Sequence, residues 1–559
     1  MRLRWLRRGI LVLLALSLLC TAVSAAEFSL TSPFFSGKRV LVLVPHQDDE
    51  LNLAGGILEQ YVQGGSEVFL VYSTNGDYNG LAEERSREVL AVARRLGIPE
   101  ENILYMGYGD QWNHQEQNGT LRKHLYFSAD PDAVWTSHFG ASHTYGTAAI
   151  GCWASRSYTR ANFLEDLLDI LLFLRPDVIY CTDYDAHHDH MALDLFFEEA
   201  MGILLAREPD YRPTVYKGFC YGTAWYAPAD YVGEDNLRSS QRPAWEHWER
   251  LGISYSWADR VRLPLSAENT GRLLSQTTVY QCLRLFESQN GRRFAPSVLN
   301  GDKVFFERRT DSLLYRAVFS DGTGTQTSWN DFKLKDSEDF SALINTGVRF
   351  APEITVTLPE PLTMDQLWLY DAPSPEDNIL GGFLVFDDGT RLEFGPLNPG
   401  GDPTKLSFPA RTVRSFTLHL TQTEGANPGL TEIEAYHGDP AGSAQPQLLM
   451  AADENGDFAY DYRTDRSGRA CFSLYAYPAG SLAGWQDVTV TAEGPGSACI
   501  LENGLLQISC PLGRSVTVTI AHSDQVRTTF TVSNPTLLTR WLQNLAQYLD
   551  AQSALLPGG

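Results

Sequence analysis

The sequence predicts an α/β fold in the first part of the chain, followed by two antiparallel β-sandwich domains. Over residues 38–182, continuous apolar runs such as VLVLV at 40–44 alternate with helical patterns. This alternation indicates a doubly wound, Rossmann-like parallel sheet that is covered on both faces. After about residue 308, short runs of alternating polar and apolar residues are joined by turns, which is typical of β-sandwiches. A chain of 559 residues has room for about three to four domains.

The α/β part is expected to span residues 37–308. Gly97 and Pro99 end one of its helical patterns, as helix-breaking residues do. Residues 108–158 form a polar loop rich in aromatic and histidine residues. The predicted strands are 39–45, 67–73, 102–107 and 177–183, and the predicted helices are 51–62, 83–96 and 162–174.

The rest of the chain is expected to form one sandwich over 309–439, a second over 446–535 and a C-terminal amphipathic helix within 536–559. The helical pattern is interrupted by glutamine and aspartate, so it is not expected to span a membrane. Its apolar face would consist of Leu538, Trp541, Leu542, Leu545 and Leu549.

The N-terminus has the pattern of a signal peptide over residues 1–26. Four arginines lie within the first eight residues, an apolar run covers 10–19, and small residues follow at 23–26. Lipid attachment at Cys20 is the alternative, but Leu19 is larger than such a site prefers. We therefore expect a secreted or extracytoplasmic protein, bacterial by character, without a transmembrane span in the mature chain.

Charge and cysteine content narrow the possible partners. The formal net charge of −24 disfavours nucleic acid. No CxxC pair is present, so a zinc knuckle is excluded, and the disulfide pairing stays open. If Asn503-Gly504 forms a two-residue turn, Cys499 pairs with Ile508, and Cys510 is then too distant for a disulfide.

Two polar clusters directly follow predicted buried strands. The first is the segment 46–50 (HQDDE), and the second is the segment 183–190 (DYDAHHDH). The carboxyl ends of parallel strands meet at one edge of a sheet, so these clusters can combine into a catalytic metal site. Imidazole and carboxylate ligands favour Zn²⁺ and admit other divalent ions. The alternatives are helix capping by the acids at 48–50 and a solvated polar loop at 183–190.

These motifs resemble those of the LmbE-like deacetylases, a family that includes the PIG-L enzymes. The resemblance covers about residues 37–308 and implies zinc-dependent removal of an N-acetyl group from an amino sugar. Gln47 and His188 stand where the family usually has proline, and His188 could compete as a ligand. The matching segments are 46–50 and 187–190, together with TNGD at 74–77, Arg85-x-x-Glu88, Leu96-Gly97 and GYGD at 107–110.

The resemblance also implies a role for each site residue. Asp48 would be the general base toward the attacking water. His187 would stabilise the tetrahedral intermediate or protonate the leaving amine, and Asp189 would orient a neighbouring histidine. The implied metal ligands are His46, Asp49 and His190.

Arg85 and Asp110 are implied to bind the sugar. Without the resemblance, Arg85 would be interpreted as one of several surface charges on its helix. The loop histidines and aromatic residues, among them Trp135, Tyr145 and Trp153, suit either sugar contact or packing within the loop.

The segment 309–439 resembles discoidin, or coagulation-factor C-type, modules through GFLV at 382–385 and GLTEIEAY at 429–436. Such a module could bind glycans or act as a spacer. The segment 446–535 resembles Ig-like modules only loosely. Both are expected to be dispensable for the chemistry.

The sequence thus favours an exported N-deacetylase acting on an N-acetylglucosamine-type sugar or glycoconjugate. One alternative is a deacylase of another N-acyl metabolite. The other, of a different class, is a glycan-binding surface protein with a vestigial catalytic domain.

Overall fold

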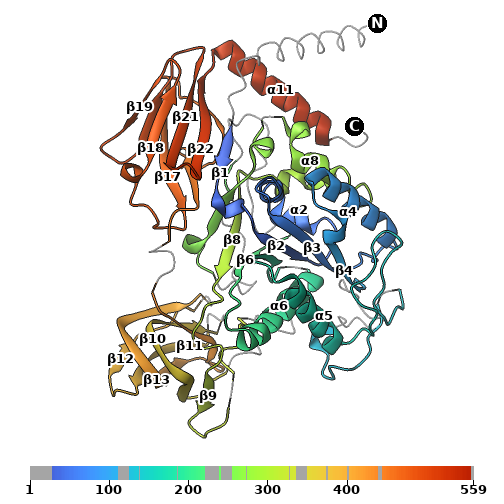
Figure 1. Ribbon diagram of the computed structural model, residues 1–559, viewed down its shortest axis with the longest axis vertical. Coiled ribbons are helices and arrows are strands. Elements are labelled where there is room, and N and C mark those ends of the chain that lie inside the picture. Colours follow the sequence, from blue (N-terminus) through green and yellow to red (C-terminus); the bar gives the residue numbers. More distant parts are fainter. Residues whose placement is uncertain are drawn as a thin grey trace.

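The computed structural model shows an α/β domain with a mixed sheet, followed by several β-sheets (Figure 1). The residues that it describes are 28–110, 125–137, 139–185, 187–220, 238–240, 255–271, 273–326, 328–334, 349–372, 376–399, 402–438 and 444–555. The predicted signal peptide therefore lies outside the described residues and stays a prediction.

The α/β domain contains a seven-stranded sheet whose strands follow the order β4-β3-β2-β5-β6-β8-β7. The first five are mutually parallel, whereas β8 runs antiparallel to β6 and β7 antiparallel to β8. The strands are β2 (Arg39–Val44), β3 (Glu67–Thr74), β4 (Ile103–Tyr108), β5 (Val178–Thr182), β6 (Thr214–Gly218), β7 (Val261–Pro264) and β8 (Asp302–Arg308).

The prediction of a wholly parallel sheet is therefore wrong at one edge. The sequence hides β6, β7 and β8 because charged residues interrupt their apolar runs. Lys217 of β6, for example, is fully buried and forms an ion pair with the buried Asp194. Pairing of this kind lets a charged residue occupy a core strand.

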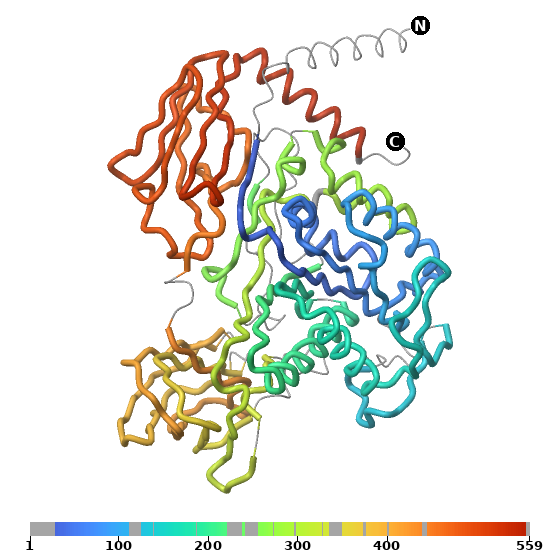
Figure 2. The backbone as a smooth tube through the Cα atoms, in the orientation of Figure 1, coloured from blue at the N-terminus to red at the C-terminus, as the bar shows by residue number. Residues whose placement is uncertain are grey.

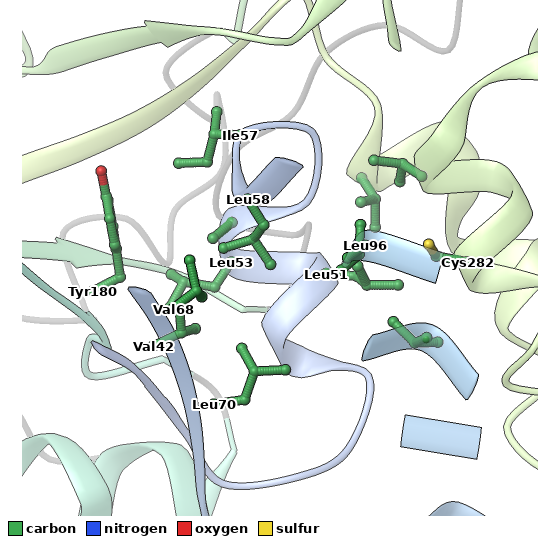
Figure 3. Packing of buried hydrophobic residues seen from close by; sticks show 14 of the residues in the cluster. Val42, Leu51, Leu53, Ile57, Leu58, Val68, Leu70, Leu96, Tyr180 and Cys282 are labelled. Carbon is green, nitrogen blue, oxygen red and sulfur yellow. The ribbon is translucent and has the colours of Figure 1, made fainter. Parts of the chain in front are cut away.

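Helices cover both faces of the sheet (Figure 1). Along β2, Val42 packs into the hydrophobic cluster on one face, part of which is drawn in Figure 3, and Leu43 packs into the cluster on the other. The helices on the first face are α2 (Asp49–Ala54), α3 (Leu58–Gln63), α4 (Ala82–Leu96), α8 (Thr278–Leu283) and α9 (Ala295–Val298), and those on the second are α5 (Arg160–Leu174) and α6 (His188–Arg207).

The single helix predicted over 51–62 is in fact two helices, α2 and α3. They are separated at Gly55 and Gly56, and Gly56 has a φ of +91°, which favours glycine. A Cβ on Gly56 would also lie 2.7 Å from the Leu265 side chain. The break turns the chain directly behind the first polar cluster.

The segment predicted as the first sandwich forms one six-stranded antiparallel sheet by hydrogen bonding. Two of its strands, β10 and β13, are long and change register along their pairing, so continuous strands replace the separate short ones that the sequence suggests. The strands are β9 (Val318–Asp321), β10 (Glu353–Asp371), β11 (Asn378–Phe386), β12 (Arg391–Phe394), β13 (Thr404–Glu424) and β14 (Leu430–Tyr436).

The last region contains two sheets that share one hydrophobic cluster. Cys499 pairs with Gln507 rather than with Ile508, because the turn is longer than two residues, with Leu501 N donating to Leu505 O. The first sheet has β15 (Leu448–Ala452), β17 (Arg469–Tyr477), β19 (Ser497–Ile500) and β20 (Leu506–Ser509). The second has β16 (Asp461–Arg463), β18 (Thr489–Glu493), β21 (Arg514–Ser523), β22 (Val526–Asn534) and the N-terminal β1 (Ser29–Thr31).

Both ends of the described chain tie the last region to the α/β domain (Figure 2). The strand β1 pairs with β22, and Phe34, shortly after it, packs against Tyr216 of β6. At the other end, α11 (Leu537–Leu555) buries Ala554 in the α/β core, and Tyr280 donates a hydrogen bond to Ala554 O at 2.7 Å. Trp541 of this helix stays exposed. Within the described residues, no helix has the length and apolar character needed to cross a membrane.

A buried ionic cluster connects β8 to the six-stranded sheet. The Arg308 guanidinium donates hydrogen bonds of 3.0 Å to Glu434 and to the Tyr370 hydroxyl. The Glu434 carboxylate also accepts hydrogen bonds from Tyr370 at 2.7 Å and from Tyr436 at 2.8 Å. Because β8 is antiparallel to β6, Arg308 at its end lies opposite Val215, near the end of the sheet where the parallel strands begin.

Candidate active site

The first polar cluster lies in the tight turn between β2 and α2. Asp48 has a φ of +109°, a left-handed conformation that is unusual for a residue other than glycine. It precedes α2, but its side chain makes no capping hydrogen bond, so the helix-capping alternative is wrong for Asp48. Its backbone N–H donates to Glu50 Oε2 at 2.9 Å. The turn thereby holds the Asp48 carboxylate partly exposed above buried neighbours.

The Asp49 carboxylate is the centre of the site. Its Oδ2 atom lies 3.1 Å from His46 Nδ1 and 3.1 Å from His190 Nε2. The same oxygen accepts the His46 backbone N–H at 3.1 Å. All three side chains are buried. The two clusters therefore meet at the carboxyl ends of β2 and β5, as the sequence predicts.

The second cluster lies where the chain leaves β5 and begins α6. Asp185 Oδ2 lies 2.7 Å from His190 Nδ1. Asp185 Oδ1 accepts a hydrogen bond of 2.9 Å from the backbone N–H of His187. His187 caps α6, with its Nδ1 accepting from Asp189 N at 3.2 Å. In a neutral ring, the proton of His187 is then on Nε2. These contacts exclude the alternative of a solvated loop.

The imidazole of His46 also contacts the second cluster. Its Nε2 lies 3.1 Å from Asp189 Oδ2, and its ring centre lies 4.7 Å from that of His187. Asp189 thus contacts both histidines, because its backbone N–H reaches His187.

Arg85 and Asp110 flank the Asp48 turn from α4 and β4. Arg85 is only 8% exposed, so its interpretation as a surface charge is wrong. Its guanidinium donates to Gln47 O at 3.1 Å and lies 3.9 Å from Asp48 Oδ1 and 3.9 Å from Asp110 Oδ2. Asp110 Oδ1 is buried and has no hydrogen-bond partner among the described residues, and it lies 4.0 Å from His46 Nε2.

The segment after β3 supports this arrangement. Asp77 accepts the Asp110 backbone N–H at 2.9 Å and the hydroxyl of Tyr145. Gly76 has a φ of +70°, and a Cβ there would lie 2.0 Å from the Gln47 side chain and 2.9 Å from Arg85 Cδ. Only glycine allows the backbone to pass this close to the site.

Burial and charge together set the pKa values of the site. Burial, and then the adjacent Asp49 carboxylate, raises the pKa of Asp48 to about 7. Burial opposes protonation of His190, but Asp185 and Asp49 raise its pKa to about 10. Burial and the nearby His46 and His190 hold the pKa of His187 well below its usual value. The carboxylates are thus balanced mainly by histidine protons and Arg85.

Other predicted residues lie away from this centre or outside the described residues. His188 is half-buried and belongs to none of the candidate ligand groups found among the described residues. In the loop, Trp153 packs against Phe173 of α5 and Tyr126 against Phe196 of α6, so these two aromatics pack on neighbouring helices rather than within the loop. Among the histidines and aromatic residues of the loop, those outside the described residues are Trp112, His114, His124 and His138.

Sequence reasoning missed two residues of the site. The carboxylate that orients the His190 ring is that of Asp185, not that of Asp189. The sequence feature that could have indicated this is an acidic residue five positions before a histidine at the start of a helix. Cys220 follows β6, and its sulfur belongs to a candidate ligand group with Asp49 and His190. It was missed because β6 itself was not predicted.

The donor set suits a divalent metal ion. Atoms bound to one tetrahedral Zn²⁺ at about 2.0–2.2 Å lie about 3.3–3.6 Å from one another, close to the 3.1 Å that separates Asp49 Oδ2 from each histidine nitrogen. The carboxylate on His190 Nδ1 leaves Nε2 directed at Asp49, as in carboxylate–histidine–metal arrangements. The chemistry of the donors therefore fits a metal site. The candidate ligand groups among the described residues are His46 with His187 and His190, Asp49 with His190 and Cys220, and His46 with Asp110 and Asp189. His46, Asp49 and His190 as one ligand set stay a prediction.

Comparison with known proteins supports a de-N-acetylase domain of the PIG-L and LmbE-like type. Residues 41–201 match the family model described as GlcNAc-PI de-N-acetylase. A probable N-acetylglucosaminyl-phosphatidylinositol de-N-acetylase of Dictyostelium discoideum is 32% identical over 77 residues, which are 14% of this chain and 28% of that protein. The chain thus spans well under half the length of this relative.

Similar solved structures include two deacetylases. The N,N'-diacetylchitobiose deacetylase of Pyrococcus horikoshii is 23% identical, with 33% of this chain and 56% of that chain covered and a TM-score of 0.21. A deacetylase of teicoplanin biosynthesis is 13% identical, with 49% and 99% covered and a TM-score of 0.28. At this similarity neither structure assigns a substrate. Residues 345–436 match a family described only as a domain of unknown function.

Proposed function

We propose that this chain is a metal-dependent hydrolase that removes the N-acetyl group from an N-acetylglucosamine-type sugar or glycoconjugate. The observation that carries the proposal is the convergence of His46, Asp49 and His190 beside the Asp48 carboxylate. The match of residues 41–201 to a de-N-acetylase family supports the reaction type. Hydrolysis would break the amide C–N bond, add water across it, and yield acetate and the free amine.

The site residues divide the work of this reaction. A divalent ion, Zn²⁺ in our proposal, would supply a Lewis acid and an acidified water. Asp48 takes the proton from the attacking water, since its carboxylate is the one in the turn that stays partly exposed. His187 donates from Nε2 to the developing oxyanion or the leaving amine, because its Nδ1 is engaged with the backbone of α6. Asp189 orients His46.

Arg85 and Asp110 would bind the sugar ring. The Arg85 guanidinium lies between the carboxylates of Asp48 and Asp110, so it can donate to a sugar hydroxyl next to the base. Asp110 Oδ1 is a buried acceptor directed toward His46. An acetyl group alone gives little orientation, so these hydroxyl contacts would fix the amide relative to the base.

Localisation and the β-sheets complete the proposal. We expect export through the signal peptide at 1–26 and no nucleic-acid partner. The discoidin-like segment 309–439 could add glycan binding. A deacylase of another N-acyl metabolite is the second candidate, because the metal ligands and Asp48 would serve any small amide.

The decisive experiment measures acetate release by the purified full chain from a panel of N-acetylated mono- and oligosaccharides, before and after metal removal by a chelator. Activity on N-acetylglucosamine saccharides that chelation abolishes and Zn²⁺ restores is expected. Arg85→Ala should lower activity while metal content stays at the wild-type level. Activity only on N-acyl amino acids would replace the substrate class, and no amide hydrolysis at all would favour a vestigial domain.

A further inference from the structure

Cys220 lies next to the metal site without any role in the reaction proposed above. It follows β6, the neighbour of β5, so it emerges at the same edge of the sheet as His190. Asp183 N donates to Gly218 O at 2.6 Å, which fixes the end of β6 against β5. Cys220 is 1% exposed and forms no disulfide. Its position is therefore set by the sheet itself.

The sulfur of Cys220 is close enough to share an ion with two of the predicted ligands. The ligand atoms of Asp49, His190 and Cys220 all lie within 4.8 Å of one another. An ion placed between three atoms with these separations would lie at most about 2.8 Å (4.8/√3) from each of them. Bonds from Zn²⁺ to such ligands are about 2.0–2.3 Å long. Shifts of well under 1 Å per ligand, about 0.5–0.8 Å, would complete the coordination.

We propose that Asp49, His190 and Cys220 form an inner metal-binding set that overlaps the His46–Asp49–His190 set. The two sets share two ligands and differ in the third, which is an imidazole in one and a thiolate in the other. On coordination the thiol loses its proton to solvent and the sulfur binds the ion. Cys220 lies in the apolar cluster of the α2 face, so the inner position is the more buried of the two.

The inner set has two consequences for this protein. A thiolate favours zinc, cadmium and cobalt over magnesium, calcium and manganese, so Cys220 biases the site toward thiophilic ions. It also retains an ion when His46 is absent, because Asp49 and His190 remain with the thiolate. The inference deepens the proposed metal site and is independent of which amide is hydrolysed.

The test uses the metal-free full chain under reducing conditions. Wild type, His46→Ala, Cys220→Ser and the double variant are titrated with Co²⁺, and the near-ultraviolet thiolate-to-cobalt absorption is recorded. Cys282→Ser is the matched control, because Cys282 is another buried thiol of the same apolar cluster. Zn²⁺ affinity is measured by competition with a chromophoric chelator, and circular dichroism checks the fold of each variant.

The absorption is expected in His46→Ala and in Cys282→Ser, and its loss is expected in both variants that lack Cys220. Adding Cys220→Ser to His46→Ala should weaken Zn²⁺ binding more than about 100-fold, since even outer partners of metal ligands cost 10–100-fold. Stoichiometric Co²⁺ binding to His46→Ala without thiolate absorption, or with absorption that survives Cys220→Ser, would overturn the inner set and leave the proposed function intact. A wild-type chain that binds neither ion would overturn both.

Discussion

Two buried ionic clusters lie at opposite ends of the parallel strands, one where the strands begin and one where they end. They differ in how their charges are balanced. At the edge where the parallel strands begin, Arg308 and Glu434 neutralise each other, and Tyr370 and Tyr436 donate to the same carboxylate. At the carboxyl ends of the strands, five carboxylates surround three histidines and one arginine. The five carboxylates are those of Asp48, Asp49, Asp110, Asp185 and Asp189.

The difference teaches how to separate a structural cluster from a functional one. In the Arg308 cluster the guanidinium and the Glu434 carboxylate balance each other, and burial raises the pKa of the neighbouring Glu432 well above its usual value. The acids of the other cluster outnumber its permanent cations, so a bound cation would complete it. Burial of charge is common to both, and only the surplus of acceptors around a shared point marks the site.

The largest effect should come from the residue at the centre of the acidic cluster. Asp49→Ala is expected to remove stoichiometric metal and all measurable activity, because Asp49 contacts both His46 and His190. A loss of affinity of more than about 100-fold is the scale expected for a ligand. Elemental analysis of the purified variant tests this, and full metal content in Asp49→Ala would contradict the assignment.

Asp48→Asn should separate catalysis from metal binding. The amide cannot accept a proton from water, so kcat/KM should fall about 10²–10⁴-fold. Asparagine tolerates the left-handed backbone that Asp48 adopts, so metal content and melting temperature should stay at wild-type values. Near-wild-type kcat/KM would remove Asp48 from the role of base.

The opposite result is expected for the structural cluster. Arg308→Met leaves Glu434 buried without its cation, and the free energy of unfolding should fall by about 3–5 kcal/mol. Metal content and kcat/KM below the unfolding transition should not change. Denaturant titration measures the loss, and the double variant with Glu434→Gln should recover part of it. Lost metal in a folded Arg308→Met chain would show that the two clusters are coupled.

A smaller effect is expected from the acid behind His190. Asp185→Asn should weaken Zn²⁺ binding about 10–100-fold, because the carboxylate that orients His190 is lost while all ligands remain. His143→Ala is the control, since His143 is an exposed histidine whose ring nitrogens lie 3.2 Å from the hydroxyls of Ser142 and Ser157. Equal Zn²⁺ affinity of the two variants would deny Asp185 a role.

The sequence predicts the meeting of the two clusters well and the surroundings poorly. His46, Asp49 and His190 follow two clearly apolar strands, and the carboxyl ends of parallel strands share one edge of a sheet, so their convergence could be predicted. Cys220 follows a strand that is interrupted by Lys217, whose buried partner Asp194 is visible only in three dimensions. Local pattern therefore finds strands that are stabilised by apolar packing and misses those that depend on a distant ion pair.

The outer regions show the same limit. The alternation of the C-terminal strands predicts antiparallel pairing correctly except at β16, which runs parallel to β22. It does not predict that β10 and β13 run on through register shifts. That the segment 446–535 is dispensable for the chemistry stays a prediction. Leu448 of this segment and Ala551 of the following helix α11 belong to the apolar cluster of the α/β domain, so removal of both would uncover apolar surface of that domain.

The pairing of β1 with β22 has a consequence for how the chain assembles. Ser29 is opposite Thr529, and Ser32 donates to Gln447 O. A three-residue strand has no stability outside a sheet, so the first described segment stays unpaired until nearly the whole chain has been synthesised. Domains usually fold in the order in which they emerge. Contacts of such high sequence separation form late, because the loop between the two segments must close first. We therefore expect β1 to be paired only after the domains that it joins have folded.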